Sequence, residues 1–243
     1  MTYKNLLISA SLGLLLLLHT PLLHAAGPFH LQSYGKFKKM VHMKKVGGVV
    51  DLKTALSGSH LFAVGAIKRG EGEITVVDSK VWLAYGRDGL GKATRVIPEG
   101  EQAVLLVTAQ VEEWQSIVVP KTLSESEMHH FVLEQAKKKG LDTKAPFPFL
   151  FEGPLASLKW HVINGLNPEF RGHGGPPLFH QFKENREKTS GTVIGFYSAG
   201  IQGVFTHPGE SWHLHILFWK EEKAGHVDEV VVGKGAVLKL PEI

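Results

Sequence analysis

The chain has 243 residues, of which 43% are hydrophobic, and it contains no cysteine. This length is enough to bury a substantial core. The core must provide the stability, because neither disulfide bonds nor a lipid anchor on cysteine is available. The net charge of +4 comes mostly from scattered residues, and no nucleic-acid recognition motif accompanies it. The composition therefore argues against a nucleic-acid-binding protein.

Residues 1–26 have the organisation of a secretory signal peptide. One positive charge, Lys4, precedes an apolar run over residues 5–18 that is too short for an ordinary transmembrane helix. The small residues Ala25 and Ala26 end the segment. We therefore predict cleavage near Ala26 and a secreted or periplasmic protein without a stable membrane anchor. An uncleaved anchor is the alternative interpretation.

The following part, residues 27–150, is predicted to be a mixed β-sheet that carries one long helix. A capping box at the start of residues 124–139 and lysines before Gly140 predict that helix, and a shorter one is expected at 50–56. Short runs rich in β-branched and aromatic residues, separated by Gly, Asp and Pro, favour strands. These predicted strands are residues 61–67, 74–78, 80–85, 103–110 and 115–119.

The second half, residues 151–243, is predicted to be an antiparallel β-barrel, which makes the whole chain α+β. Residues 142–154 contain three prolines and are expected to be an extended connector at the domain boundary. Residues 165–186, rich in Gly, Pro and charge, are expected to be a long loop. Short turns separate the predicted strands of this half, which are residues 192–197, 200–206, 211–219, 227–232 and 236–240.

A glycine-rich segment at residues 86–92 matches the first positions of a phosphate-binding loop. However, Ala93 stands where a hydroxyl should hold magnesium, and no helix follows to offer its N-terminus to a phosphate. The segment is therefore predicted to be a glycine-rich hairpin.

Three histidines near the C-terminus form the clearest candidate site. His213 and His215 alternate along a predicted strand, so their side chains share one face. His226 opens the next strand after a polar turn, and a hairpin would bring it back towards the pair. Three neutral imidazoles with an open position are the ligand set of a catalytic zinc site. Two surface histidines on a half-buried strand are the alternative, which needs no third partner.

Three further residues are candidates on weaker grounds. Glu73 enters a strand after a tight turn, where a carboxylate can ligate a metal, move a proton or be only a surface charge. His207 precedes the predicted strand that carries His213 and His215, and it is a candidate fourth metal ligand or acid. The alternative is that it only helps to form a turn. His60 precedes a strand, and we expect it to lie away from the site.

The order of several motifs resembles the alpha-acetolactate decarboxylase family, over about residues 52–240. The motifs are Val64-Gly-Ala-Ile67, Gly70-Glu-Gly-Glu73 continuing to Asp78, Gly191-Thr-Val-Ile-Gly-Phe196, His213-Leu-His215 and Ala224-Gly-His226-Val227. The resemblance implies that the three histidines bind Zn²⁺ and that Glu73 contributes near the metal. It also implies a lyase that converts 2-acetolactate, a 2-hydroxy-3-oxo acid, to acetoin and carbon dioxide.

The chain departs from that family at two points. The family's catalytic arginine lies in a strand where this chain has Lys159-Trp-His161-Val, so His161 takes its place. Members also carry a C-terminal extension with a further glutamate, whereas this chain stops at Ile243. An imidazole lacks the rigid bidentate fork that a guanidinium offers to a carboxylate. We expect His161 to face the substrate carboxylate or to act as an acid.

Two other functions fit the same residues. One is an exported metal- or ligand-binding protein that kept the site and lost the chemistry, which the missing arginine favours. The other is a cupin-like metal oxygenase or isomerase, in which Glu221 or Glu222 would complete the ligand set after His215. The main partner expected is a small 2-hydroxy-3-oxo acid, and a homodimer is compatible with the sequence.

Overall fold

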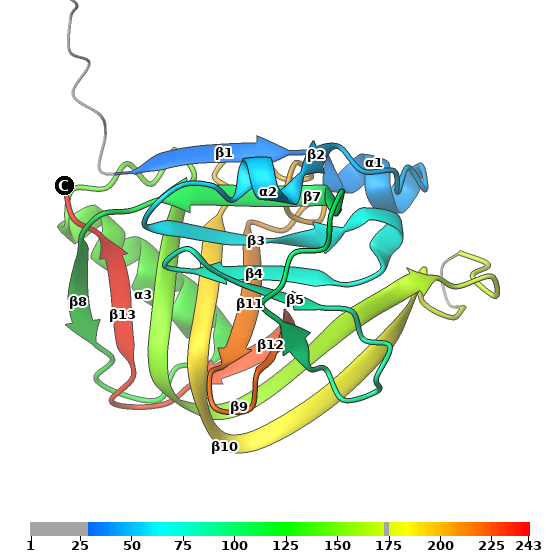
Figure 1. Cartoon of the computed structure of the whole chain (residues 1–243). Coiled ribbons are helices and arrows are strands. Elements are labelled where there is room, and N and C mark those ends of the chain that lie inside the picture. The colour runs from blue at the N-terminus through cyan, green and yellow to red at the C-terminus, as the bar shows by residue number, and fades with distance from the viewer. Residues whose placement is uncertain (1–28, 173–174) are drawn as a thin grey trace, which may run out of the picture.

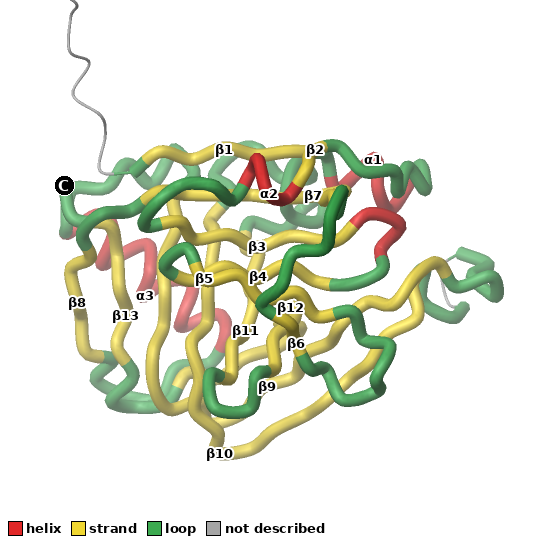
Figure 2. The backbone as a smooth tube through the Cα atoms, in the orientation of Figure 1, coloured by secondary structure: helices red, strands yellow, loops and turns green. Residues whose placement is uncertain are grey.

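The structure is a computed structural model that describes residues 29–172 and 175–243 (Figure 1). The predicted signal peptide lies outside the described residues. Strands are the most common regular element of the described backbone (Figure 2). None of the helices in these two ranges is both long and apolar enough to cross a membrane.

The first sheet is entirely antiparallel, so the prediction of a mixed sheet is wrong. Consecutive strands such as β3, β4 and β5 are joined by short turns, and a short turn can only reverse the chain direction. The strand order is β1-β7-β3-β4-β5-β6, with β2 beside β7. The strands are β1 (His30–Tyr34), β2 (Val50–Asp51), β3 (Leu61–Ile67), β4 (Glu73–Val77), β5 (Lys80–Ala84), β6 (Ala93–Thr94) and β7 (Gln102–Gln110).

The second sheet is also antiparallel, with the order β10-β11-β12-β9-β13-β8 and an additional pairing of β10 with β9. Among the described residues the sheet is not the closed barrel that the sequence predicts: β10 also pairs with β9, but β13 and β8 extend the sheet and leave β8 as an edge strand. Its strands are β8 (Trp114–Val118), β9 (Phe147–Leu166), β10 (Phe179–Tyr197), β11 (Trp212–Phe218), β12 (Lys223–Val232) and β13 (Val237–Pro241).

Two long strands replace much of the predicted connector and part of the predicted loop. β9 begins at Phe147, inside the expected connector, because Phe147, Phe149 and Phe151 alternate and bury one apolar face. β10 begins at Phe179, so only residues 167–178 remain a loop. Arg186 stabilises the charged start of β10 through ion pairs with Glu184 on the same strand and with Glu221 in the turn between β11 and β12. Composition alone does not predict these two strands, because their residues pair with residues far away in the sequence.

The predicted strand at residues 200–206 is also wrong, since this segment forms turns. Gly200 and Gly203 adopt positive φ values, and the amide of Val204 donates to the carbonyl of Ile201. The turns form a loop between β10 and β11 that carries His207.

The long helix α3 (Glu125–Lys138) has the predicted capping box, in which Ser124 and Glu127 exchange hydrogen bonds. It packs on β12 of the second sheet rather than on the first sheet, where the sequence placed it. The short predicted helix is α2 (Leu52–Ala55), which starts later than expected because residues 50–51 pair with β7. A further helix, α1 (Phe37–His42), is absent from the sequence prediction.

The two sheets pack against each other through β3, β4 and β5 on one side and β10, β11 and β12 on the other. In Figure 1 the strands of the first sheet run across the view, whereas those of the second run steeply. Phe62 and Leu105 of the first sheet share a buried cluster with Ile194 and Phe196 of the second. Each such side chain contributes roughly 1.5–3 kcal/mol on burial. The space between the sheets also holds the polar residues described next.

Candidate metal centre

Three histidines of the second sheet converge on one point. His213 and His215 lie on β11, and His226 lies on β12 directly opposite His215 in the antiparallel register. The ring centroids of His213 are 5.1 Å from those of both His215 and His226, and the remaining pair is 5.6 Å apart. One ring nitrogen from each residue lies within 4.8 Å of the other two. The hairpin thus brings together the residues that the sequence singles out.

Burial keeps these imidazoles neutral. His213 is 4% exposed and His215 is fully buried. Burial lowers the pKa of His213 to about 3, although a hydrogen bond with the backbone of Phe205 raises it. Burial also lowers the pKa of His215 and of His226 well below the ordinary value, and neighbouring histidines add to the effect. Neutral imidazole is the form that binds a metal ion.

Two nitrogens of the cluster lack partners. In the part of the chain that the structure describes, Nδ1 of His213 and Nε2 of His215 are buried without any hydrogen bond. Such groups are costly to leave unpaired. The other nitrogen of His215, Nδ1, lies 2.9 Å from Oγ1 of Thr75, a contact that fixes the ring and leaves Nε2 free for a ligand. The donor set fits a divalent metal such as zinc.

Glu73 enters the site from the opposite sheet. It shares a face of β4 with Thr75, and its Oε2 lies 3.6 Å from Nε2 of His215. The backbone N–H of Ile163 donates to Oε1 at 3.4 Å. Only 4% of the residue is exposed, which excludes the surface-charge alternative. Glu73 lies beside the group of three mutually close ligand nitrogens and is not part of it.

Burial raises the pKa of Glu73 to about 7, while the neighbouring His161 and the hydrogen bond from Ile163 lower it. A carboxyl group with this pKa exchanges a proton readily near neutral pH. A cation bound by the three histidines would favour the charged form, because opposite charges attract strongly in a buried site.

His161 lies at the same site on β9. Its Nε2 is 3.9 Å from Oε1 of Glu73, and its ring centroid is 5.0 Å from that of His226. Its Nδ1 is 2.8 Å from Oδ1 of Asp228, so Asp228 fixes the ring and directs Nε2 towards Glu73. His161, which the resemblance predicts in place of an arginine, therefore has a carboxylate partner.

Asp228 is a site residue that the sequence analysis missed. It follows His226 at the alternating spacing of a strand, and this spacing is the signal that could have found it. However, the register of β12 with β9 shifts between Val227 and Glu229, as in a β-bulge. A bulge turns a side chain in a new direction, and it cannot be located from a single sequence.

We expect the contact between His161 and Asp228 to be detectable by NMR. In the wild type the Nδ1 proton of His161 should exchange slowly with water, because it is donated to a carboxylate. Asp228→Ala should abolish this protection, whereas Asp228→Asn should keep part of it, since the amide oxygen still accepts. Glu229→Ala is the control, because Glu229 pairs with Lys159. Equal exchange in wild type and Asp228→Ala would contradict the assignment.

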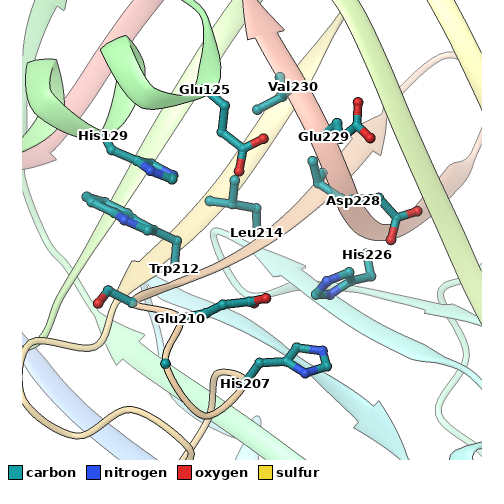
Figure 3. Close-up of a pocket in the computed structure, with 13 residues that line it drawn as sticks. Glu125, His129, His207, Glu210, Trp212, Leu214, His226, Asp228, Glu229 and Val230 are labelled. Carbon is teal, nitrogen blue, oxygen red and sulfur yellow. The ribbon is translucent and has the colours of Figure 1, made fainter. Parts of the chain in front are cut away.

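Two cavities reach the metal centre, and His207 and His226 line both. One has a volume of about 300 Å³ and includes Glu73, His161 and His213 in its lining. The other, of about 460 Å³, is surrounded by carboxylates that include Glu125, Glu210 and Asp228 (Figure 3). Burial raises the pKa of Glu125, and the nearby charges of Glu229 and Glu210 raise it further. The acidic cavity is therefore unfavourable for an anion.

The two other candidate histidines, His207 and His60, lie in different parts of the structure. The ring of His207 packs on Phe37 with centroids 4.0 Å apart, and burial lowers its pKa, an effect that Glu210 opposes. His207 therefore faces the site from the loop before β11. His60 lies outside it, since it is half exposed and 3.5 Å from Asp78 at the far end of β4.

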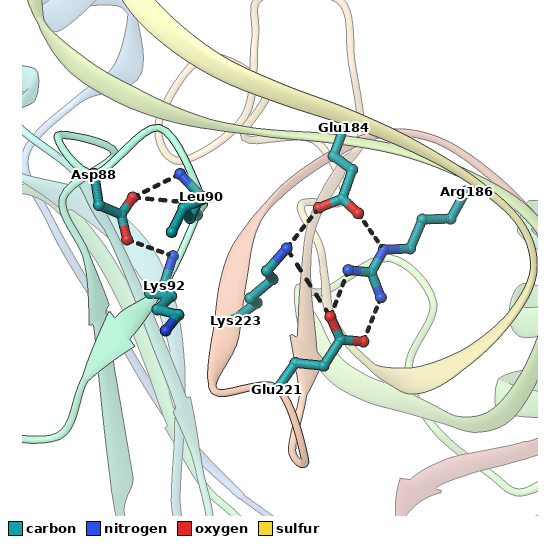
Figure 4. A network of polar contacts seen from close by, with 8 residues as sticks. Asp88, Leu90, Lys92, Glu184, Arg186, Glu221 and Lys223 are labelled. Carbon is teal, nitrogen blue, oxygen red and sulfur yellow. Dashed lines mark hydrogen bonds and ion pairs between the residues drawn. The ribbon is translucent and has the colours of Figure 1, made fainter.

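The ligand set of the cupin-like alternative is not formed. Glu221 makes two short contacts with the guanidinium of Arg186, of 2.6 and 2.7 Å (Figure 4). Glu222 is exposed, with a positive φ value. The metal-ligand group found among the described residues consists of the three histidines alone.

The segment at residues 86–92 is no phosphate site, as the sequence predicts. The carboxylate of Asp88 accepts hydrogen bonds from the backbone N–H groups of Leu90, Gly91 and Lys92 (Figure 4). Backbone N–H groups gathered in this way are the donors that a phosphate would need. The loop's own carboxylate therefore occupies them.

Comparison with known proteins shows the family and the fold of the chain. Residues 58–240 match the alpha-acetolactate decarboxylase family, whereas no curated protein matches the sequence. A Staphylococcus aureus protein of unknown function, described as similar to alpha-acetolactate decarboxylase, has a similar structure. It is 16% identical, with a TM-score of 0.66 over 88% of this chain and 85% of that one.

Two Bacillus subtilis enzymes share the fold as well. The alpha-acetolactate decarboxylase of strain 168 is 13% identical, with a TM-score of 0.63 over 88% of this chain and 86% of that one. The acetolactate decarboxylase of subspecies spizizenii is 16% identical, with a TM-score of 0.62 over the same shares. The family match covers well over half of the sequence and includes all three histidines. The chain therefore belongs to the alpha-acetolactate decarboxylase family.

Proposed function

We propose that the protein is a zinc-dependent decarboxylase that converts 2-acetolactate to acetoin and carbon dioxide. Family membership and fold support a decarboxylase-type function. The observation that carries the finer proposal is the cluster of His213, His215 and His226, with two buried nitrogens left unpartnered beside the protonatable Glu73. This arrangement offers a metal site and a proton carrier in one cavity.

His213, His215 and His226 would hold the metal. Bound zinc supplies a Lewis acid that stabilises the negative charge developing on substrate oxygens as carbon dioxide leaves. Thr75 maintains the orientation of His215 through the contact with Nδ1.

Glu73 would move the proton that the reaction needs. When the bond between C2 and the carboxylate breaks, its electron pair stays on C2, and C2 must gain a proton to give acetoin. The N–H of Ile163 engages Oε1 of Glu73, so Oε2 is the oxygen free to carry that proton. A pKa near the working pH suits this role, because the group can both release and regain a proton.

His161 would meet the substrate carboxylate. Its Nδ1 is engaged by Asp228, and Nε2 is therefore the atom that faces the cavity. In the imidazolium form, Nε2–H donates a charge-assisted hydrogen bond to a carboxylate. A single donor replaces the bidentate guanidinium fork, so we expect weaker binding of the carboxylate than an arginine would give.

The test is the incubation of zinc-loaded protein with 2-acetolactate, with acetoin and carbon dioxide measured together. Equal amounts of both products are expected. The residues that line the two cavities include neither Arg nor Lys, and this favours a ligand-binding protein as the second candidate. Stoichiometric metal uptake without carbon dioxide release would support that second candidate.

We also propose that the protein is exported after cleavage of its N-terminal segment. The apolar run before Ala26 is the supporting feature. N-terminal sequencing of protein recovered outside the cytoplasm is expected to give a start within a few residues of Ala26. Exported protein that still begins at Met1 would show that the segment is not removed.

A further inference from the structure

The cavity that holds Glu73 and His161 has a second, apolar side. Its polar lining comes from the loop that carries His207 and from β4, β9, β10, β11 and β12. The apolar side chains come from α1 and from Phe170, Leu178 and Phe179. We call this side the apolar chamber and define it by Phe37, Met40, Val41, Phe170, Leu178 and Phe179.

The chamber is fixed in place by specific contacts. The backbone N–H groups of Phe37 and Lys38 donate to the carbonyls of Val204 and Gly203, which anchors α1 to the loop that carries His207. On the other side, the ring of Phe179 lies directly on Gly70. A Cβ at position 70 would come within 2.2 Å of this ring. The chamber is therefore preformed, and its walls are held by both sheets.

2-Acetolactate has too little apolar surface to cover the apolar chamber. Pockets for small-molecule ligands measure ~300–1,000 Å³, and this cavity of about 300 Å³ falls within that range. The apolar surface of 2-acetolactate consists of two methyl groups only. Most of the chamber would stay uncovered with this substrate, and uncovered apolar walls give no binding energy.

The orientation of a larger substrate follows from the charges. The six side chains that define the chamber are all apolar, so a carboxylate and its neighbouring oxygens belong at the histidine side of the cavity. We propose that the preferred substrate is a 2-hydroxy-3-oxo acid with a longer alkyl chain or an aromatic ring, which lies in the apolar chamber. This inference rests on the decarboxylase function proposed above and narrows its substrate class.

The chemistry is unchanged for such a substrate. The bond between C2 and the carboxylate breaks, carbon dioxide leaves, and C2 keeps the electron pair and takes up one proton. The product is a longer or aromatic hydroxyketone. No oxidant or reductant is needed.

The first experiment measures the zinc-loaded protein with a series of 2-hydroxy-2-methyl-3-oxo acids, whose ketone substituent grows from methyl to pentyl. We expect kcat/KM for carbon dioxide release to rise about fourfold per added methylene until the chamber is full. The second experiment measures binding of 2-hydroxy-2-methylalkanoic acids of increasing length by calorimetry. These acids lack the 3-oxo group and do not decarboxylate, and their affinity should rise by the same factor.

A matched pair of variants locates the effect. Val41→Phe adds a ring to the chamber and should flatten both series, because the space for the longer chains is filled. Val49→Phe makes the same change at a position that is 52% exposed, and both slopes should persist. If Val41→Phe does not fold, the wild-type series still decides the question.

The outcomes separate the two proposals. Affinity that rises with length without carbon dioxide from any substrate would support the chamber and overturn the decarboxylase. Carbon dioxide release with no dependence on length would keep the decarboxylase and overturn the inference. A rise in both series that survives Val41→Phe would also overturn the inference, because the longer group would then lie elsewhere. Absence of both binding and release would overturn both proposals.

Discussion

A double variant, His213→Ala with His215→Ala, is expected to purify without metal, whereas the wild type should hold about one zinc per chain. These residues supply two of the three ligand nitrogens, and both unpartnered nitrogens of the cluster belong to them. A single remaining imidazole on His226 cannot hold zinc against dialysis. Elemental analysis of dialysed protein measures the result.

The same double variant should lose carbon dioxide release by at least ~10³-fold. Loss of the metal removes several kcal/mol of transition-state stabilisation, and each 1.36 kcal/mol corresponds to a factor of about ten. The control is a double variant, His60→Ala with His180→Ala, which removes two exposed histidines and should keep its zinc. Full metal content in the His213/His215 variant would disprove the metal site.

Glu73→Gln is expected to lower the rate of carbon dioxide release by about 10²–10⁴-fold, the usual contribution of a general acid or base. The amide oxygen of Gln can still accept the hydrogen bond from Ile163, so the fold should persist. The side-chain amide of Gln cannot take up or release a proton in the working pH range. Turnover at saturating substrate measures the loss, with zinc content determined on the same sample.

The matched control lies two residues away in sequence. Glu71→Gln is the same chemical change on a surface carboxylate that pairs with Arg69 and Arg87, and the rate should stay within about twofold. A Glu73→Gln variant that turns over normally but binds zinc weakly would show that Glu73 acts as a metal ligand and not as the proton carrier.

The features that the sequence predicts well depend on local spacing. His213 and His215 occupy alternate positions of one strand, and this period survives in the structure because a buried face fixes the register. The helix α3 follows in the same way from the capping box at Ser124. In both cases the signal lies within a few residues of the element that it specifies.

The features that the sequence misses depend on distant partners. The charged start of β10 becomes a strand because Arg186 meets Glu221, 35 residues away, and because β9 offers a long ladder. Asp228 contacts His161 at a point where the register of β12 is shifted by a bulge. Helix α1 lines the cavity and is held there by hydrogen bonds to residues 203–204. Such pairings arise only when the whole chain is packed, and a single sequence does not specify them.

The division of the site between two sheets links metal affinity to folding. Thr75 and Glu73 approach from β4, and the histidines approach from β11 and β12, so the complete site exists only while the sheets are docked. An ion that binds only this docked state raises the free energy of unfolding by about 2.7 kcal/mol at a concentration 100 times its Kd. By the same thermodynamic cycle, a substitution that loosens the buried cluster shared by Phe62 and Phe196 should weaken metal binding without changing a ligand. We therefore expect the affinity for zinc to vary with the free energy with which the two sheets pack against each other.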